Sequence, residues 1–537
     1  MKLLYIYTSI LIVSATFSFA DTKTSHDANG GVAGGGPIET HEQGEHGKNC
    51  ISEIDRANIK RGIERFVQEF GPLSAPSERG IPAHFPIYPL GGVQGEDLYT
   101  TGFVDLDEGS GFSDWNCGIH TYDGHFGSDA LIVTFDHQLI GVPVVSVLDG
   151  TVVATHDGEP DQNIEWLGQP ANYVIIDHGQ GRVCKYLHLK TWSVVVTPGQ
   201  QVKAGEEIGL VGSSGNSDWP HLHFETLDDD VVIEPYTGSC NPGESQWVDQ
   251  DIVFTDTQCW DFGVTLENLD DFYANSSTRW RPTVDGYIPL NHDYVWMWSH
   301  GRNLPAWSTC RFRFYNPSGN LYYDSDWFWI NFSPVTDILW FRYFYWDLTG
   351  LHTTPGTWNV EMTVNGDPYI QFPLEVVAPF EQTPNRAPQP ILAVIQPATP
   401  TAQDILTCRL YTAGPLDDLD WDLVRYHYTW SIGGRIVRDT ISAGQADHLP
   451  RLEGCDGAVV ECTVVPSDGI TDGIPNTVTV RLAGVSNGDA NCDGTFDVHD
   501  ILILLGNWGS CGVCAGDFDG DGEVDVHDIL ILIANWS

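Results

Sequence analysis

The stretch Pro220-His221-Leu222-His223-Phe224-Glu225 alternates polar and apolar side chains, which is the pattern of a β-strand. Residues i and i+2 of a strand point to the same face, so His221 and His223 would project together toward one site while the residues between them face a core. One histidine of such a pair can hold a metal ion while its neighbour transfers protons. With the turn Gly212-Ser213-Ser214-Gly215-Asn216-Ser217 before it, the stretch predicts a site on one face of a β-sheet.

Two other short pieces supply candidate partners for this pair. Gly124-His125-Phe126-Gly127-Ser128-Asp129 places a histidine and an aspartate four residues apart, and zinc accepts both imidazole and carboxylate ligands. Tyr186-Leu187-His188-Leu189 places a histidine in an apolar strand, where it would ordinarily be a satisfied core residue. Each piece alone is a weak signal, because His and Asp at this spacing are far more often surface residues.

Taken together, these pieces resemble the lysostaphin/LytM family of zinc metallopeptidases, in that family's order. The resemblance extends to the hairpin over 147–153 and the glycine turn over 197–205, and it covers roughly residues 115 to 235. It implies an antiparallel β peptidase domain in which His125, Asp129 and His223 bind zinc. It further implies that His188 and His221 are catalytic residues off the metal, with His221 as general base and His188 orienting the water or stabilising the oxyanion, although the two roles could be exchanged.

The resemblance implies a zinc-dependent endopeptidase. Three protein ligands leave a fourth position for water, which is the arrangement of a catalytic zinc, and the zinc-activated water would attack the scissile carbonyl. The family commonly cuts peptide cross-links of bacterial cell walls, so a peptidoglycan peptide is the first expected substrate. Three alternatives stay open: a secreted metalloprotease of extracellular proteins, a non-catalytic LytM-like binding or activator protein, and a calcium-dependent adhesion or scaffold component.

Composition predicts a multidomain, mainly β protein. The 537 residues exceed one core, and 42% hydrophobic residues with 56 glycines and 31 prolines suit modules rich in strands and turns. The net charge of -48 would repel nucleic acid and anionic membranes, so no nucleic-acid partner is expected. The same charge gives no general attraction to an anionic wall.

The N-terminus predicts export. Lys2, the apolar run 3–13 and Ser18-Phe19-Ala20 form a signal peptide over residues 1–20, with no membrane span after its cleavage. Twelve cysteines follow, so disulfides are expected in a secreted or cell-surface protein, although their pairing stays open. Cys117 and Cys184, near the motif histidines, are expected in disulfides and not as thiolate ligands.

The segments before and within the peptidase region differ in character. Residues 21–49 form a Gly/His-rich linker or pro-segment, in which the run 41–46 is rejected as a zinc helix because position 45 is Glu. Residues 50–110 are an N-terminal helix and extension, the helix being predicted over 55–70 and packed on the next domain. Residues 111–247 are the peptidase domain, whose insertion over 157–171 is equally well a wall of the substrate groove or a plain surface loop.

Two β modules are expected to follow the peptidase domain. Residues 248–380 are rich in aromatics and predict a β-sandwich. Residues 388–484 predict an immunoglobulin-like module, with Trp430 packed on a disulfide between Cys408 and Cys462. Four aspartates over 417–422 are interpreted as a solvated acidic turn in preference to a calcium site.

Residues 486–537 contain an internal repeat with a period of 28 residues, and each copy predicts a calcium loop. Oxygen ligands with a glycine at position 6 suit Ca²⁺, and a helix is expected after each loop, over 501–505 and 529–533. The candidate ligands of the first loop are Asp489, Asn491, Asp493, Thr495, Asp497 and Asp500, and those of the second are Asp517, Asp519, Asp521, Glu523, Asp525 and Asp528.

These paired loops resemble a dockerin module. The resemblance implies that positions 10 and 11 of each loop recognise a cohesin-bearing partner, and the corresponding residues here are Val498, His499, Val526 and His527. Family members often carry a hydroxyl pair at these positions, so the partner stays open. A calcium-stiffened tail without a cohesin is the alternative.

Overall fold

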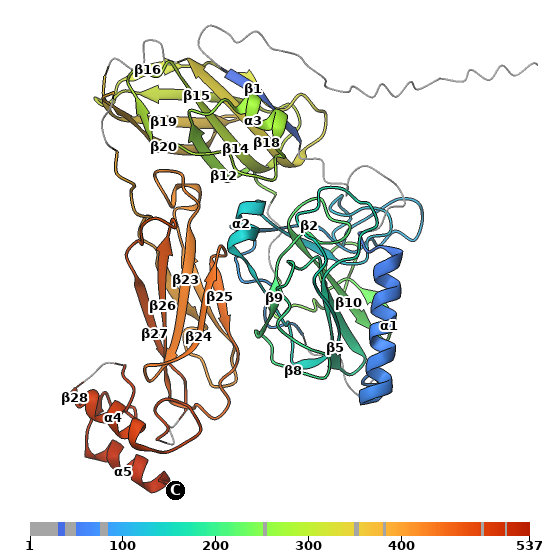
Figure 1. The fold of residues 1–537 in the computed structure, drawn as a ribbon, viewed down its shortest axis with the longest axis vertical. Helices are drawn as coiled ribbons and strands as arrows, with labels where there is room; N and C mark the ends of the chain where they lie inside the picture. The colour runs from blue at the N-terminus through green and yellow to red at the C-terminus, as the bar shows by residue number, and fades with distance from the viewer. Residues whose placement is uncertain are drawn as a thin grey trace, which may run out of the picture.

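The computed structural model describes residues 31–37, 50–75, 84–250, 255–347, 354–379, 383–484, 488–510 and 513–536. Most regular elements are strands, so the mainly β prediction is confirmed. The predicted signal peptide and the run 41–46 lie outside the described residues. Figure 1 shows the peptidase region beside the second β module, the aromatic-rich module above both, and the C-terminal helices at the far end.

The peptidase region is built on an antiparallel sheet of eight strands. Its central strand, β10 (His221–Asp228), lies between β3 (Ser128–Ile132) and β7 (Arg182–Leu187). The remaining strands are β2 (Leu98–Gly102), β6 (Tyr173–Gly179), β5 (Gly150–His156), β8 (Gln201–Val202) and β11 (Val231–Ile233). A separate pair, β4 (Pro143–Val145) and β9 (Glu207–Leu210), and the short helix α2 (Phe135–Ile140) complete it.

The apolar residues of the stretch 220–225 face a core, as the alternation of this stretch predicted. Leu222 and Phe224 are buried with Ile176 and Tyr186 in the main cluster of this region. Because strand side chains alternate, this burial turns His221 and His223 to the opposite face of β10.

Helix α1 (Glu53–Phe70) confirms the predicted N-terminal helix and begins two residues earlier than expected. Ser52 caps it: the Asp55 amide donates to the Ser52 hydroxyl, and Asp55 in turn accepts from Ser52. Ile59 and Phe66 pack on a cluster that includes Val153 and Ala154 of β5. The helix therefore lies against the peptidase sheet, as Figure 1 shows.

The aromatic-rich module consists of two sheets. One pairs β1 (Gly31–Pro37), β18 (Asp337–Asp347), β14 (Tyr294–Leu304) and β12 (Gln258–Thr265). The other contains β13 (Tyr287–Pro289), β20 (Asp367–Val377), β19 (Gly356–Val364), β15 (Thr309–Tyr315), β16 (Leu321–Asp324) and β17 (Phe328–Trp329). Helix α3 (Leu269–Asn275) follows β12.

Strand β1 comes from the segment predicted to be a Gly/His-rich linker or pro-segment; residues 31–37 pair with β18, so they are not a flexible linker, and the pro-segment stays a prediction. Sequence periodicity could not reveal this strand, because it is mostly glycine. A side chain at Gly35 would meet the Phe341 carbonyl at 2.3 Å, so only glycine permits this close pairing with β18.

The second β module also has two sheets. One sheet contains β21 (Leu392–Gln396), β22 (Leu406–Tyr411) and β25 (Ala446–Leu449). The other contains β24 (Arg435–Ser442), β23 (Arg425–Ile432), β26 (Val459–Ser467) and β27 (Asn476–Arg481). A short 3-10 turn, η2 (Gly414–Leu416), follows β22. Trp430 is buried in its core as expected. Cys408 and Cys462 lie in the same core but remain thiols, and burial together with the neighbouring Cys408 raises the pKa of Cys462.

The acidic turn of this module is not solvated, which corrects the sequence interpretation. Asp417, Asp418 and Asp420 are all buried. Asp417 accepts from the Tyr426 hydroxyl, and Asp420 forms an ion pair with Arg386 at 2.7 Å. Hydrogen bonds inside the fold, which the sequence does not reveal, replace water at Asp417 and Asp420, whereas the buried Oδ2 of Asp418 has no hydrogen-bond partner among the described residues. Asp418, Asp420 and Asp422 form a group that could hold a metal ion, which was the alternative to a solvated turn.

The C-terminal module contains helices α4 (Val498–Gly506) and α5 (Val526–Asn535) and the short strands β28 (Gly509–Ser510) and β29 (Glu523–Val524). Both helices begin three residues earlier than predicted. Asp497 and Asp525 cap them in capping boxes with Asp500 and Asp528, so the end of each loop is already helical.

Two disulfides join described residues, Cys117–Cys240 and Cys455–Cys492, and Cys514 is also disulfide-bonded. Six cysteines remain thiols, so the general expectation of disulfides is wrong for them, Cys184 included: Cys50, Cys184, Cys259, Cys310, Cys408 and Cys462. Among the described helices, none is both long and apolar enough to cross a membrane.

Candidate active site

The register of the sheet assembles the site. His223 on β10 lies opposite Asp129 on β3 and opposite Leu187 on β7. His188 follows Leu187 directly, and its φ of 64° lies in the left-handed region. The strand therefore ends before His188, contrary to the prediction of a strand histidine. A non-glycine residue in this conformation is typical of functional sites, where the surrounding structure supports the strain.

Three side chains bring their donor atoms to one point. His223 Nδ1 is 2.7 Å from Asp129 Oδ1, and His125 Nε2 is 2.9 Å from Asp129 Oδ2. His125 Nε2 and His223 Nδ1 are 3.3 Å apart. Two nitrogens about 2.1 Å from a tetrahedral zinc ion would be about 3.4 Å apart, so this spacing suits the ion. The chemistry of the donor set, two imidazoles and a carboxylate, is also that of a catalytic zinc.

Contacts on the far side of the ligand rings fix their orientation. His125 Nδ1 lies 2.7 Å from the Phe103 carbonyl, so Nδ1–H donates there and Nε2 is left for a metal. His223 Nε2 lies 3.4 Å from Glu225, whose carboxylate pairs with Lys185 at 2.6 Å. Such backing contacts are the usual way that proteins present imidazole to a metal.

The two predicted catalytic histidines lie beside this cluster. Their rings are 4.6 Å apart between centroids. His188 Nδ1 donates to the Ser214 carbonyl at 2.6 Å, and His221 Nδ1 donates to the Trp219 carbonyl at 2.7 Å. Among the described residues, neither Nε2 atom has a hydrogen-bond partner, although both atoms are buried. Two oriented acceptors are thus available for a substrate or a water molecule.

The charges of the site are strongly coupled. Burial alone would lower the pKa of His125, but Asp129 outweighs it and raises that pKa to about 10. Burial would raise the pKa of Asp129, but His125 and His223 hold it well below its ordinary value. Burial lowers the pKa of His221, and the neighbouring His188 lowers it further. The site thus favours an ionised Asp129 and a neutral His221, and His125 would have to give up its proton to bind a metal ion.

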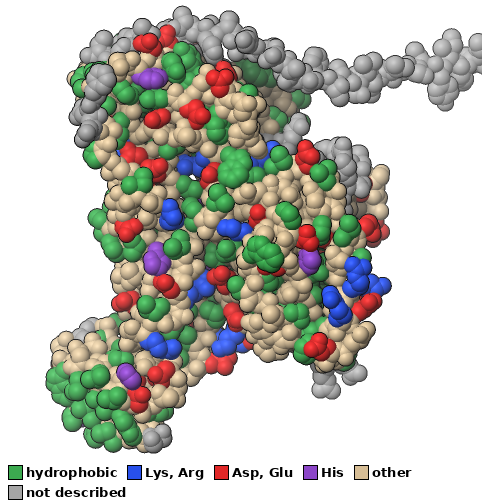
Figure 2. Space-filling model, viewed as in Figure 1, with side chains coloured by type: hydrophobic (Ala, Val, Ile, Leu, Met, Phe, Trp, Pro, Cys, Tyr) green, Lys and Arg blue, Asp and Glu red, His purple; other side chains and the backbone are tan. Residues whose placement is uncertain are grey.

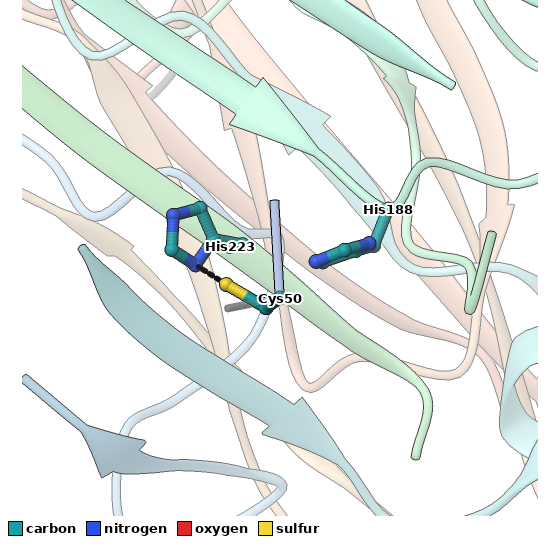
Figure 3. A group of neighbouring side chains, drawn as sticks. All are labelled: Cys50, His188 and His223. Atoms are coloured by element: carbon teal, nitrogen blue, oxygen red, sulfur yellow. Dashed lines mark hydrogen bonds between the residues drawn. The ribbon is translucent and has the colours of Figure 1, made fainter. Parts of the chain in front are cut away.

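A cysteine that the sequence did not single out completes the cluster. Cys50 Sγ is 3.3 Å from His223 Nδ1, across 173 positions of sequence. Figure 3 shows Cys50 between His223 and His188. A lone cysteine before an amphipathic helix carries no signal of its own, so only the fold could reveal it.

The loop before β10 is supported from two sides. Asn163 and Gly168 of the insertion 157–171 donate to Gly215 and Asn216 at 2.9 and 2.8 Å. On the other side, Arg279 of the aromatic-rich module donates to the Asp218 carbonyl at 2.7 Å and stacks over Trp219. The insertion therefore borders the site, as one of its two interpretations expected.

Four nearby histidines, expected to be surface or turn residues, belong to none of the metal-binding groups among the described residues: His120, His137, His156 and His178. All four are partly buried, so they are less exposed than expected. His178 lies in strand β6 and not in a turn, and its Nδ1 donates to the Asp149 carbonyl at 2.9 Å.

Predicted calcium ligands accept hydrogen bonds from their own loop in the first copy, and three of them approach one another in the second. In the first, Asp489 accepts from the Gly494 amide at 2.9 Å, and Asp500 accepts from Ala490 at 2.8 Å. In the second, Asp517, Asp519 and Asp521 have oxygens within 4.8 Å of one another. The predicted recognition residues lie in the first helical turns; Val498 and Val526 are each 54% exposed, and His499 and His527 are exposed as well.

Comparison with known proteins places this site in a recognised domain. Residues 134–235 match Peptidase family M23. This matched range includes His188, His221 and His223, and it begins just after Asp129. An uncharacterized metalloprotease of Buchnera aphidicola is 36% identical over 96 residues, 18% of this chain and 23% of that protein. The peptidoglycan DD-endopeptidase ShyA of Vibrio cholerae is 41% identical over 88 residues, 16% of this chain and 18% of that protein.

A relative with a different role also matches. The murein hydrolase activator EnvC of Escherichia coli is 33% identical over 95 residues, 18% of this chain and 20% of that protein. The chain spans less than a quarter of the length of each of these three relatives. The matches agree with the geometry in placing the chemistry on one sheet: the segment around β10 matches Peptidase family M23, and the proteins similar to it include peptidoglycan endopeptidases.

Proposed function

We propose that this protein is a secreted, zinc-dependent endopeptidase that hydrolyses peptide cross-links of bacterial peptidoglycan. The observation that carries the proposal is the convergence of donor atoms from His125, Asp129 and His223 beside two buried, unpartnered Nε2 atoms. An activator without catalysis would not need the five residues in this arrangement.

The chain's own residues have separate roles in this proposal. His125, Asp129 and His223 hold the ion, which when bound supplies Lewis acidity to the scissile carbonyl and to a water molecule. His221 takes a proton at Nε2, because its Nδ1–H is committed to the Trp219 carbonyl. His188 Nε2, equally oriented through the Ser214 carbonyl, positions the attacking water or stabilises the developing oxyanion.

The preference for a wall substrate rests on the relatives. ShyA and two further matching proteins of Vibrio cholerae, ShyB and ShyC, are peptidoglycan DD-endopeptidases by name. The net charge of -48 supplies no attraction to an anionic wall, so we assign any targeting to the modules that follow. Hydrolysis of extracellular proteins is the second candidate, because the same site would cut any peptide that reaches it.

We propose a separate role for the C-terminal module: it binds two calcium ions and docks a cohesin-like partner. Its two helices expose matching apolar rows, Val498, Leu502 and Leu505 on α4 and Val526, Leu530 and Ile533 on α5. Figure 2 shows hydrophobic side chains gathered on this module. A repeated apolar face of this kind is typical of a protein-binding surface.

The test of the peptidase proposal uses purified full-length protein and measures new amino termini released from cell walls and from a soluble protein. Both wild type and Cys50→Ala are assayed, because the Cys50 thiol lies 3.3 Å from the proposed ligand atom of His223. We expect release from walls that chelation abolishes and added zinc restores. Release that survives chelation and His125→Ala would contradict the metal mechanism, and equal or greater release from the soluble protein would favour the second candidate.

A further inference from the structure

We propose that Cys50 is a fourth, inhibitory zinc ligand and that residues 50–75 keep the peptidase latent until they are displaced. The inference rests on the proposed function, because it concerns the same site. It adds a ligand from outside the matched peptidase segment and a means of regulation. Three observations carry it: the position of the thiol, the burial of the site, and the way the segment is anchored.

The position of the thiol is that of a ligand. Cys50 Sγ lies 3.3 Å from His223 Nδ1, and His223 belongs to two groups with donor atoms within 4.8 Å of one another, one with Cys50 and His188 and one with His125 and Asp129. A thiolate sulfur and an imidazole nitrogen on one tetrahedral zinc ion would be about 3.6 Å apart, given bond lengths of about 2.3 and 2.1 Å. Cys₁His₂Asp is a donor set that zinc accepts.

Charge also favours this arrangement. The site is buried, and an uncompensated charge in a buried site is costly. One carboxylate from Asp129 and one thiolate from Cys50 balance the two positive charges of Zn²⁺. On coordination the thiol releases its proton to solvent, and it takes up a proton again when it leaves the ion.

The burial of the site shows that it is closed to a substrate. The side chains of His125, His188 and His223 are 0% exposed and that of His221 is 4% exposed. Cys50 and Ile51 are themselves 1% and 2% exposed. A peptide chain must reach the acceptor atoms of His188 and His221 to be cut, so the segment that carries Cys50 has to move first.

The anchoring of the segment explains how the thiol is held in place. Directly after Cys50, the capping box of Ser52 and Asp55 starts helix α1. Asp55 also accepts from the Ala171 amide at 2.8 Å, which ties this cap to the insertion beside the site. Arg56 stacks over Phe126, between the ligands His125 and Asp129, at 5.3 Å.

The rest of α1 contributes an apolar contact with the sheet. Ile59 and Phe66 belong to the same cluster as Leu187, the residue before His188. At the end of the segment, the Ser74 amide donates to Asp177 at 2.8 Å. These contacts hold residues 50–75 against the peptidase sheet, so weakening them would release the Cys50 thiol from the site.

A rival interpretation assigns Cys50 as a nucleophile paired with His223. The two interpretations make opposite predictions, because removing a nucleophile abolishes hydrolysis whereas removing an inhibitory ligand increases it. The register of His223 opposite Asp129 favours a metal ligand over a general base.

The test uses full-length protein in which cobalt replaces zinc, with Cys50→Ser as the variant and Cys184→Ser as the control. Cys184 is another buried thiol of the same domain, and it lies in the main core away from the cluster. We expect a near-ultraviolet cobalt–thiolate charge-transfer band in wild type and in the control, and no band in Cys50→Ser. Absence of the band in wild type would overturn the assignment of Cys50 as a ligand.

Two further measurements extend the test, and the first of them, made on wild type, depends neither on the folding of a variant nor on catalysis. Alkylation of wild type, located by mass spectrometry, should modify Cys50 slowly in the zinc form and at least about tenfold faster after chelation. Hydrolysis of cell walls by Cys50→Ala should exceed the wild-type rate by about tenfold or more, since the competent state is no longer a minor population.

The outcomes separate the two proposals. Equal hydrolysis by wild type and Cys50→Ala, or loss of hydrolysis in Cys50→Ala with wild type active, would overturn latency. A thiolate band in wild type, with no hydrolysis by any variant, would retain Cys50 as a ligand and reject the endopeptidase function instead.

Discussion

The molecule contains two kinds of candidate metal site, and they are built in opposite ways. The peptidase site draws its residues from separate segments, with 98 positions between His125 and His223 and 173 between Cys50 and His223. Each C-terminal loop takes all its candidate ligands from one short continuous stretch of chain, residues 489–500 or residues 517–528. The first site is fully buried, whereas Asp521 and Glu523 of the second loop are exposed.

This difference predicts different dependence on the ion. In the peptidase site, backbone carbonyls of Phe103, Ser214 and Trp219 orient the histidines whether or not an ion is present. In the loops, Asp489 and Asp517 accept from amides of the same loop, and the contacts from outside come through the Cys455–Cys492 disulfide, Arg435 and the Arg481–Asp517 ion pair at 3.0 Å. A preorganised site tolerates loss of its ion better than a local loop does.

The largest effect on hydrolysis is expected from the buried ligands. His223→Ala, tested in the Cys50→Ala background, should lower wall hydrolysis by about a thousandfold or more, because the ion contributes several kcal/mol of transition-state stabilisation. Zinc content, measured by elemental analysis, should fall with it. The control is His156→Ala, which removes a partly exposed ion pair with Glu159. If His223→Ala retained zinc and activity, His223 would not be a zinc ligand, and the description of the peptidase site in this comparison would be wrong.

The next effect concerns the catalytic histidines. His188→Ala and His221→Ala should each lower kcat by about 10² to 10⁴-fold while zinc content is unchanged, because neither residue is proposed as a ligand. The hydrolysis rate of each variant, measured against pH in the Cys50→Ala background, would show which histidine acts as the general base. The variant that lacks this histidine loses the part of the pH–rate profile that reports protonation of the base. If either variant loses zinc stoichiometrically, that histidine is a ligand and the assignment of three ligands is wrong.

A smaller effect is expected from Arg279, which contacts the site only through the loop before β10. Arg279→Ala should lower kcat by about tenfold with little change in KM, because Trp219, whose carbonyl orients His221, loses a stacked cation. Arg313→Ala is the matched control, since it lies in the same module and pairs with Glu361 instead. Identical effects of the two variants, or a loss of thermal stability that accounts for the whole change, would remove Arg279 as a positioning residue.

The smallest effect on hydrolysis is expected from calcium. Asp500→Ala together with Asp528→Ala should leave hydrolysis of a soluble peptide unchanged and abolish calcium binding measured by calorimetry. Calcium at about 100 times its dissociation constant should stabilise the wild-type module against unfolding by about 2.7 kcal/mol for each occupied loop. Loss of peptidase activity on selective removal of calcium would show that the two kinds of site are coupled, contrary to the comparison.

Much of the fold and the site was predictable where the signal is local or recurs in a known order. The alternation around His221 and His223, the period of α1 and the repeat of the C-terminal loops are all read from neighbouring residues. The glycine strand β1 gave no such signal, and neither did the burial of Asp417, Asp418 and Asp420, because both depend on contacts with distant segments. His188 was placed correctly beside the site, but its left-handed conformation was not foreseen.

The sequence by itself determined the β character of the chain, the calcium candidates and a helix predicted over 55–70, while its resemblance to the lysostaphin/LytM family supplied the zinc candidates. The first three follow from periodicity and ligand chemistry, which act over a few residues. Only the tertiary structure decided that Cys50 meets His223, that Arg279 supports the loop before His221, and that the site is closed. Long-range proximity is set by strand register and domain packing, and a single sequence carries no measure of either.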